Sequence, residues 1–284
     1  MLALRTLRFT FPAMLRLTRF WNLAVIGFAQ YFTAGFLIDI RLFQDGRLFL
    51  LSISTILIAA AGYVINDYYD IKIDLINKPD RVVIGKSITR RYAIFFHTVL
   101  SFSGVSIGFL LNWKIGVVNF LSSFVLWVYS NNFKRQPFVG NFTVAFLTGL
   151  SIELINVLYG VNQQLVTIYA VFAFFMTLIR EIIKDIEDLK GDNTFGCRTL
   201  PIVWGIRKTK VTVFGLLIVF GTSVIALNLF FVGLPMYYLI VFLFLPLGWL
   251  WVRLIRADTV KDFYSLSLFC KIIMLLGILS MTFV

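Results

Sequence analysis

Nine apolar stretches, each long enough to cross a lipid bilayer, occupy most of this 284-residue sequence. A membrane-spanning helix needs roughly 17–25 predominantly apolar residues. The predicted spans lie at about residues 17–38, 48–66, 92–111, 115–131, 141–160, 164–182, 211–231, 234–252 and 264–283. We therefore expect an all-α integral membrane protein with nine transmembrane helices, in which residues 1–284 form a single polytopic domain.

The overall composition excludes a water-soluble globule. Hydrophobic residues make up 60% of the sequence and charged residues only 14%, whereas soluble domains carry roughly 25% charged residues. The formal net charge is +12, but basic loops that face anionic lipid headgroups account for it without a nucleic-acid partner. We expect a multi-pass protein of the cell membrane, with the bilayer as its surroundings and no obligatory protein partner.

The distribution of Lys and Arg predicts the orientation of the spans. When the loops alternate between the two sides and the N-terminus starts inside, 22 of the 26 basic residues fall in cytoplasmic segments. Cytoplasmic loops of membrane proteins carry such an excess of positive charge. We therefore expect a cytoplasmic N-terminus and, with nine spans, a C-terminus on the outside.

Acidic residues gather at the cytoplasmic ends of the second and sixth predicted spans. Each cluster contains the pattern D-x2-D-x3-D, formed by Asp67, Asp70 and Asp74 in the first and by Asp185, Asp188 and Asp192 in the second. Positions i, i+3 and i+7 lie on one face of an α-helix, as do Asn66, Asp70 and Asp74 at i, i+4 and i+8. If each span continues as a helix into the cytoplasm, it carries a stripe of carboxylates there.

Grouped carboxylates without His or Cys neighbours favour a hard cation such as Mg²⁺ over zinc or copper. In proteins Mg²⁺ takes one or two carboxylates together with substrate phosphates. Basic residues on the same side can hold such phosphates and stabilise charge on a departing diphosphate. They are Lys72, Lys78, Arg81, Lys134, Arg135, Lys184 and Arg198. The two clusters therefore predict an interfacial site for a diphosphate with Mg²⁺.

Three other interpretations fit parts of this pattern. Acids and bases at the ends of spans can be simple solvated loops, although two matching clusters on one side disfavour that interpretation. Ion-coupled transporters also repeat carboxylates, but their key acids lie near the bilayer midplane rather than at the ends of spans. A CDP-alcohol phosphotransferase would carry a D-G-x2-A-R string, which this sequence lacks.

The residues of the two clusters resemble the UbiA family of intramembrane prenyltransferases. The family motif N-D-x-x-D-x-x-x-D is matched by Asn66, Asp67, Asp70 and Asp74, and the motif D-x-x-x-D by Asp188 and Asp192. The segment NKPDR at 77–81 also resembles the family, although Val82 stands where a proline is usual. The resemblance covers nearly the whole chain.

Together with the charge pattern, the resemblance implies Mg²⁺-dependent transfer of an isoprenyl group from an isoprenyl diphosphate to a hydrophobic acceptor. It implies that Asp70, Asp74, Asp188 and Asp192 are catalytic and bind the metal with Asn66. The residues expected to bind substrate are Asn66, Asp67, Lys72, Lys78, Arg81, Lys134, Lys184, Asp185 and Arg198. The active site is expected on the cytoplasmic side.

The nature of the acceptor is indicated by two segments near the second cluster. REIIKDIEDLKGD at 180–192 and TLPIVWG at 199–205 look most like the family branch that alkylates geranylgeranylglycerol phosphate in ether-lipid synthesis. Branches that prenylate aromatic or quinone precursors, or tetrapyrroles, share the same two motifs and are alternatives.

Two polar residues inside predicted spans have both a functional and an ordinary interpretation. His97, in the third span, is more typical of a packed or interfacial histidine than of a proton carrier. Glu153, in the fifth span, is a functional candidate because acids inside a membrane are costly. With Asn156 one turn further on, it can equally form hydrogen bonds within the helix bundle.

Overall fold

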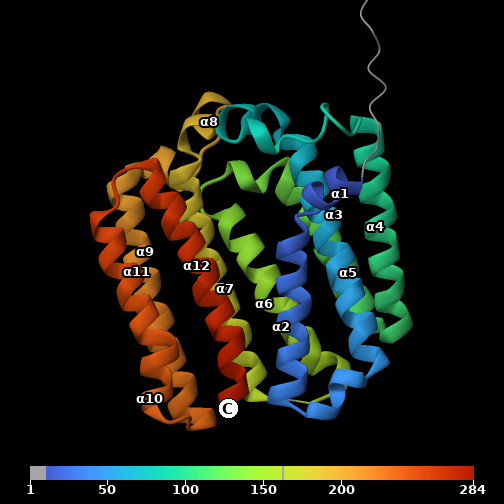
Figure 1. The fold of residues 1–284 in the computed structure, drawn as a ribbon, viewed down its shortest axis with the longest axis vertical. Coiled ribbons are helices and arrows are strands. Elements are labelled where there is room, and N and C mark those ends of the chain that lie inside the picture. The colour runs from blue at the N-terminus through green and yellow to red at the C-terminus, as the bar shows by residue number, and fades with distance from the viewer. Residues whose placement is uncertain (1–10, 162) are drawn as a thin grey trace, which may run out of the picture. The chain divides into compact units, whose positions relative to one another are not determined.

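The computed structural model describes residues 11–161 and 163–284, which are almost entirely helical (Figure 1). The helices are α1 (Phe11–Leu17), α2 (Phe20–Leu37), α3 (Gly46–Asn77), α4 (Arg90–Leu111), α5 (Trp113–Asn131), α6 (Val139–Tyr159), α7 (Gln164–Glu187), α8 (Leu189–Thr194), α9 (Leu200–Leu227), α10 (Met236–Leu239), α11 (Leu245–Arg256) and α12 (Val260–Ser280). The expected all-α architecture is confirmed.

Eight helical segments of the described chain are long and apolar enough to cross a membrane, and each coincides with a predicted span. They are α2, α3, α4, α6, α7, α9 with its π-helical extension Asn228–Val232, α10 together with α11, and α12. The helices overrun several predicted ends; α7, for example, continues to Glu187. Polar residues form the same backbone hydrogen bonds as apolar ones, so the helix can continue beyond the apolar part of the sequence.

Helix α5 occupies the place of the predicted fourth span but is too polar to count with the other eight. Its buried Asn119 donates hydrogen bonds to the Gly104 carbonyl, at 3.2 Å, and to Ser54 Oγ. Ser54 in turn donates to the same carbonyl at 3.1 Å. These bonds join α3, α4 and α5, and interhelical bonds of this kind satisfy polar groups where water is absent. The polarity of α5 is thus compensated inside the protein.

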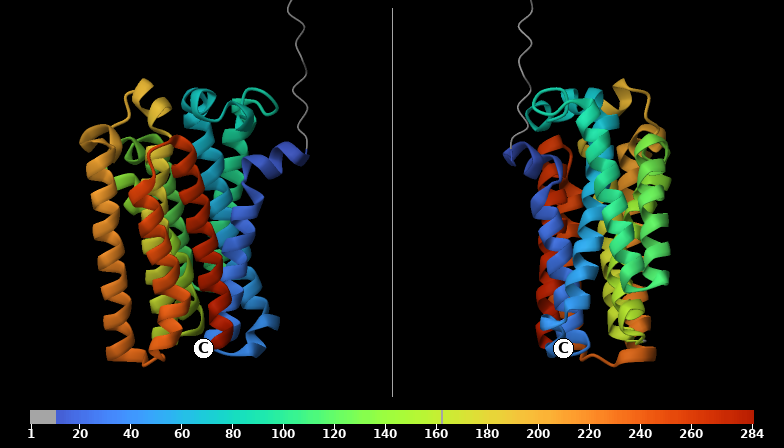
Figure 2. Two further views of the ribbon diagram at one scale, coloured as in Figure 1. Left: turned by 60° about the vertical axis from the view of Figure 1, so that its left-hand side comes forward. Right: turned by 90° about the vertical axis from the view of Figure 1, so that its right-hand side faces the viewer.

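The described chain forms two compact units. One contains the described residues up to Gly27 together with Leu50–Asn132, and the other contains Phe28–Phe49 together with Phe133–Val284. In the first unit, α4 and α5 pack side by side as a helical hairpin (Figure 1). In the second unit, α7 packs against three partners, α6, α9 and α12 (Figure 2).

Helix α7 is the structural centre of the second unit. Ile179, Ile182 and Ile183 are completely buried, and they pack in one core with Phe220 of α9 and Phe263 of α12. A residue so buried touches several neighbours at once, so the helix has little freedom to rotate. This core holds the polar end of α7, where the second Asp cluster lies, in a fixed orientation within its unit.

Candidate active site

The first Asp cluster lies near the end of α3, which runs without interruption as far as Asn77. The prediction that the second span continues as a helix through this motif is confirmed. Asn66, Asp70 and Asp74 therefore follow one face of the helix. Asp70 is buried, and the other two are half-buried. A stripe of one amide and two carboxylates thus extends over about the last three turns of α3.

Asp67 is held by Arg19, a residue that the sequence analysis left out of the site. Arg19 Nη2 lies 2.8 Å from Asp67 Oδ1, and the guanidinium lies over the Tyr63 ring, 4.8 Å from its centroid. Burial favours the neutral form of Arg19, but Asp67, Tyr63 and Asp74 together outweigh this and raise the pKa of the guanidinium above its ordinary value. Arg19 has a φ of 54°, in the left-handed region that few residues other than glycine adopt. The available signal was a basic residue at the start of the first span.

The predicted basic residues of the first unit lie at and beyond the end of α3. Lys72 is an exposed residue of α3, Lys78 precedes the short 3-10 turn Pro79–Arg81, and Arg81 is exposed. Val82, which replaces the usual proline, has a φ of −66°. A proline ring imposes nearly the same angle, so the replacement leaves the course of the backbone unchanged.

The second Asp cluster is not one continuous helix, and the prediction of a second unbroken stripe is wrong. Helix α7 ends one residue before Asp188, which has a φ of −90° and a ψ of 5°, and α8 begins one residue after it. Hydrogen bonds still cross the break: Asp188 N–H donates to the Lys184 carbonyl at 2.9 Å, and Asp192 N–H to the Asp188 carbonyl at 3.2 Å. Carboxylates one turn apart repel each other in a helix, and the break falls at the middle aspartate of the three.

Asp185, the first aspartate of this cluster, accepts a hydrogen bond from Asn141. The amide Nδ2 lies 2.9 Å from Oδ2 of the carboxylate, and Asn141 is buried in the first turn of α6. The preceding residue, Gly140, lies against the turn before α6, where a Cβ would come within 2.7 Å of Lys134 Cα. Glycine is therefore required for this approach. Asn141 was not among the predicted site residues; its signal was an amide inside an apolar stretch.

Lys134 lies in the 3-10 turn Phe133–Arg135, which leads into α6. Its ammonium group is close enough to interact electrostatically with Asp192 and Lys184. Burial lowers the pKa of Lys134 to about 8, although the Asp192 carboxylate opposes that shift. Lys134 is thus a basic residue beside the second Asp cluster, and its role in binding phosphate stays a prediction.

The chain that follows α8 returns to the same turn. The backbone N–H of Arg198 donates to the Arg135 carbonyl at 2.8 Å, while the Arg198 side chain is exposed. Within the second unit, the structure thus brings Lys134 and Arg198 to the region of Asp185 and Asp192. Lys184 and Asp188 also belong to this unit, and the remaining predicted residues of the site belong to the first unit.

The donor set of the two clusters fits a hard divalent cation such as Mg²⁺, because it consists of carboxylate and amide oxygens. Among the described residues, no three His, Cys, Asp or Glu side chains converge tightly enough to hold a metal ion alone. Mg²⁺ suits such a set, since it usually binds one or two carboxylates and completes its coordination with water and substrate phosphates. In the first unit the residues whose chemistry fits this role are Asn66, Asp70 and Asp74, and in the second unit they are Asp188 and Asp192.

The two polar residues inside spans have structural partners. Glu153 accepts hydrogen bonds from Asn156 at 2.8 Å and from Thr167 of α7 at 3.2 Å, so it links α6 to α7. His97 Nδ1 lies 3.0 Å from the Ala61 carbonyl of α3. Both contacts match the ordinary interpretation of these residues.

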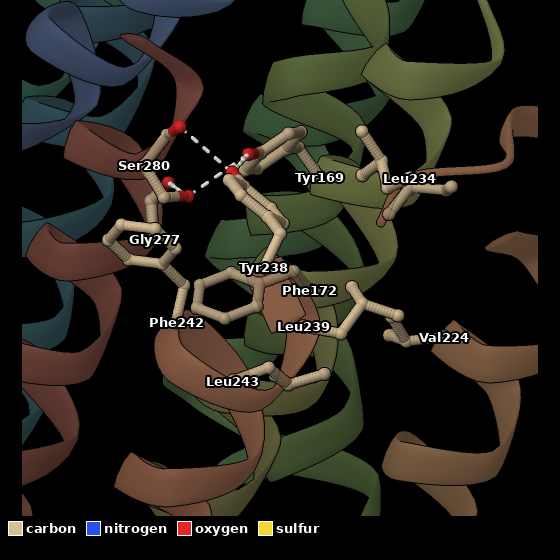
Figure 3. Close-up of a pocket in the computed structure, with 11 residues that line it drawn as sticks. Tyr169, Phe172, Val224, Leu234, Tyr238, Leu239, Phe242, Leu243, Gly277 and Ser280 are labelled. Atoms are coloured by element: carbon tan, nitrogen blue, oxygen red, sulfur yellow. Dashed lines mark hydrogen bonds between the residues drawn. The ribbon is translucent and has the colours of Figure 1, made fainter. Parts of the chain in front are cut away.

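An apolar cavity lies at the other end of α7 (Figure 3). Its polar edge is a hydroxyl cluster in which Tyr169 contacts Tyr238 at 2.6 Å and Ser280 Oγ at 3.0 Å. Tyr238 also donates to the Ser280 carbonyl at 2.8 Å. Tyr169 precedes Asp185 by 16 residues, or about 24 Å of helix. The cavity is therefore separate from the second Asp cluster.

The fold and the clusters together define a class: multi-pass, all-helical membrane proteins whose helix ends carry carboxylates suited to Mg²⁺. The sequence profile described as the UbiA prenyltransferase family matches residues 24–273 of the chain. The chain belongs to this family, and the resemblance seen in the two motifs is confirmed.

Individual relatives agree with the profile. The chain is 33% identical over 273 residues to digeranylgeranylglyceryl phosphate synthase of Saccharolobus solfataricus, and the match covers 94% of both chains. Its match to the protein of the same name from Methanococcoides burtonii, at 34% identity, spans only 61% of that protein's length.

Solved structures show the same architecture. A structure reported for digeranylgeranylglyceryl phosphate synthase in membranes superposes with a TM-score of 0.73 and 25% identity, over 96% of this chain and 97% of the other. A UbiA homologue from Archaeoglobus fulgidus, bound to DMAPP and Mg²⁺, has a TM-score of 0.61 at 15% identity, over 95% and 99% of the two chains. The latter likeness is one of fold.

Proposed function

We propose that this protein transfers an isoprenyl group from an isoprenyl diphosphate to a hydroxyl of geranylgeranylglycerol phosphate, with Mg²⁺ as cofactor, in ether-lipid synthesis. The observation that carries the proposal is the complete N-D-x-x-D-x-x-x-D motif on the unbroken helix α3. Membership of the UbiA prenyltransferase family supports the reaction type. The name shared by the relatives from S. solfataricus and M. burtonii supports the acceptor.

The proposal includes a topology. Residues 1–284 form one polytopic domain with nine spans, which are the eight described above together with α5. The N-terminus is cytoplasmic and the C-terminus lies outside. The 19-residue length of α5 and its compensated Asn119 support its place as a span. The excess of Lys and Arg on one side supports this orientation, in which both Asp clusters lie at the cytoplasmic face.

Each group of site residues has a role that follows from its chemistry. Asn66 and the four aspartates at 70, 74, 188 and 192 hold Mg²⁺, which when bound neutralises the diphosphate and helps it leave. Asp67 and Asp185 lie close to these metal-binding residues in the sequence. The basic residues bind the diphosphate, and their positive charge stabilises the negative charge that develops as the carbon–oxygen bond breaks. The basic residues are Lys72, Lys78, Arg81, Lys134, Lys184 and Arg198. The acceptor hydroxyl then bonds to the released carbon and loses its proton, which gives an ether.

The test is product analysis with purified protein in detergent. The protein is offered isoprenyl diphosphates of several chain lengths with geranylgeranylglycerol phosphate, an aromatic acid, a quinone precursor and a tetrapyrrole, and the products are identified by mass spectrometry. We expect an ether of the glycerol phosphate, formed only when Mg²⁺ is present. A prenylated aromatic compound or tetrapyrrole in its place would reassign the acceptor.

Variants of the two Asp clusters test the site itself. We expect Asp70→Ala and Asp188→Ala each to lower turnover by roughly 100-fold or more, because they remove charge that binds the metal and the leaving group. Asp258→Ala is the matched control, since its side chain is 88% exposed and lies outside both clusters. Normal turnover in either cluster variant would contradict the site assignment.

A further inference from the structure

Arg180 is a charged residue inside a membrane-spanning helix, eight positions before Asp188 on α7. Its side chain is only 18% exposed. A charge in a membrane span is costly, so it marks a functional site unless its partners fully account for it. The partners of Arg180 therefore decide whether the residue is structural.

One buried donor of Arg180 forms no hydrogen bond with the described residues. Its Nη1 atom pairs with the Glu181 carboxylate, but its Nε atom is buried and has no hydrogen-bond partner among the described residues. A buried donor without an acceptor costs free energy comparable to that of a lost hydrogen bond. The charge of Arg180 is also close enough to interact electrostatically with the Cys270 thiol of α12. The guanidinium can therefore donate a further hydrogen bond to a bound group.

Glu181 forms ion pairs with both Arg180 and Lys184. Its Oε2 atom also lies 3.7 Å from Lys184 Nζ, so two cations share one carboxylate. Arg180 and Lys184 are spaced at i and i+4, which places them on one side of α7. Two basic side chains thus lie on one face of the helix that leads to the proposed metal-binding Asp188.

We propose that Arg180, assisted by Lys184, binds the phosphate monoester of the lipid acceptor. The inference rests on the proposed function and deepens it, because it names the part of the acceptor that this site recognises. Arginine offers a planar fork of N–H donors that matches phosphate oxygens in pairs. Eight residues of helix separate Arg180 from Asp188 by about 12 Å, so the acceptor phosphate and the metal-bound diphosphate occupy different positions. An acceptor without an anionic group leaves the Nε donor unused.

The test compares two acceptors that differ only in the phosphate: geranylgeranylglycerol phosphate and unphosphorylated geranylgeranylglycerol. Wild-type protein is expected to prefer the phosphorylated acceptor in kcat/KM. Arg180→Gln is expected to lower kcat/KM for that acceptor by roughly 30-fold or more, mainly through KM. Turnover of the unphosphorylated acceptor and the KM of the isoprenyl diphosphate are expected to stay near their wild-type values.

Two further variants complete the experiment. Arg180→Lys keeps the charge but loses the planar fork, so its preference for the phosphorylated acceptor should fall between those of wild type and Arg180→Gln. Arg207→Gln, which removes an exposed arginine of α9, is the matched control and should behave as wild type.

Three results would overturn the inference, and the first needs no variant. Wild-type protein could use both acceptors equally well, Arg180→Gln could lose activity equally with both, or the KM of the diphosphate could rise instead. Failure of the proposed function has a different signature, since wild-type protein would then alkylate neither glycerol lipid while prenylating another acceptor.

Discussion

The side-chain amide of Asn141, at the start of α6, donates a hydrogen bond of 2.9 Å to the carboxylate of Asp185, near the end of α7. The two residues are 44 positions apart in the sequence. The bond fixes the direction of a carboxylate that lies three residues before the helix break at Asp188.

Removal of this amide is expected to affect catalysis more than folding. Asn141→Leu should lower kcat by about 10–100-fold, the usual cost when an outer partner of a metal site is lost, because Asp185 lies beside the proposed metal-binding Asp188. Asn141→Ser, which keeps a short donor, should recover part of the rate. Thr143→Val on the same buried turn serves as the control, because Thr143 bonds only to the Val139 carbonyl of its own helix. An Asn141→Leu protein with wild-type kcat would contradict the positioning role.

The Arg19–Asp67 pair predicts coupling between the start of α2 and the first motif. The two side chains are only partly exposed, at 34% and 17%. Arg19→Gln and Asp67→Asn should each destabilise the protein, and their effects should be non-additive by ~1 kcal/mol. The measurement is a double-mutant cycle of thermal unfolding in detergent. Strictly additive effects would show that the pair contributes no coupling.

The lowered pKa of Lys134 predicts a pH dependence of donor binding. Because this pKa is about 8, the side chain is cationic below that pH and neutral above it. The kcat/KM for the isoprenyl diphosphate should therefore decline as the pH rises through about 8. Lys134→Arg, whose guanidinium stays charged, should move the decline to higher pH. Lys208→Arg, at an exposed position of α9, should leave the pH profile unchanged. An unshifted pH profile for Lys134→Arg would contradict the assignment of Lys134 to donor binding.

The hydrogen bonds of Asn119 predict the stability of the first unit. Asn119→Leu removes the links to Gly104 and Ser54, and we expect a loss of ~1 kcal/mol, since interhelical bonds in membranes contribute about 0.6–1.7 kcal/mol each. Leu121→Ala, at an exposed position of the same helix, should cost less. Unfolding in a titration with denaturing detergent measures both, and equal midpoints for Asn119→Leu and wild type would refute the expectation.

The sequence predicted the parts of the fold that the bilayer constrains. Apolar length located eight of the helices, and the spacing of Asn66, Asp70 and Asp74 correctly implied that α3 continues beyond its apolar part. The same spacing failed at Asp188, because a helix break of one residue depends on local repulsion and packing rather than on periodicity. Helix boundaries such as the start of α9 at Leu200 were missed for a related reason: hydropathy records burial in lipid, not backbone hydrogen bonding.

Site contacts between distant residues were the hardest to predict. Nothing in the sequence connects Asn141 with Asp185, because that bond arises only when α6 packs on α7. The partner of Asp67 could not be predicted for the same reason, since Arg19 lies at the start of the first predicted span, 48 residues away. Val82 shows the opposite case: a departure from the usual residue is harmless because its φ of −66° suits both side chains.

The 32 residues of α3 have a consequence for the membrane in which the protein works. They correspond to about 48 Å of helix, whereas the hydrocarbon core is about 30 Å thick. In the proposed topology, the last 12 residues, Asn66–Asn77, account for the difference and would carry the first motif to the headgroup layer. A thicker bilayer would draw that motif toward the hydrocarbon, and a thinner one would lift it into water. The proposed function therefore predicts that the reach of these carboxylates to the diphosphate of a membrane-dissolved donor depends on bilayer thickness, so that lipid chain length becomes a determinant of activity.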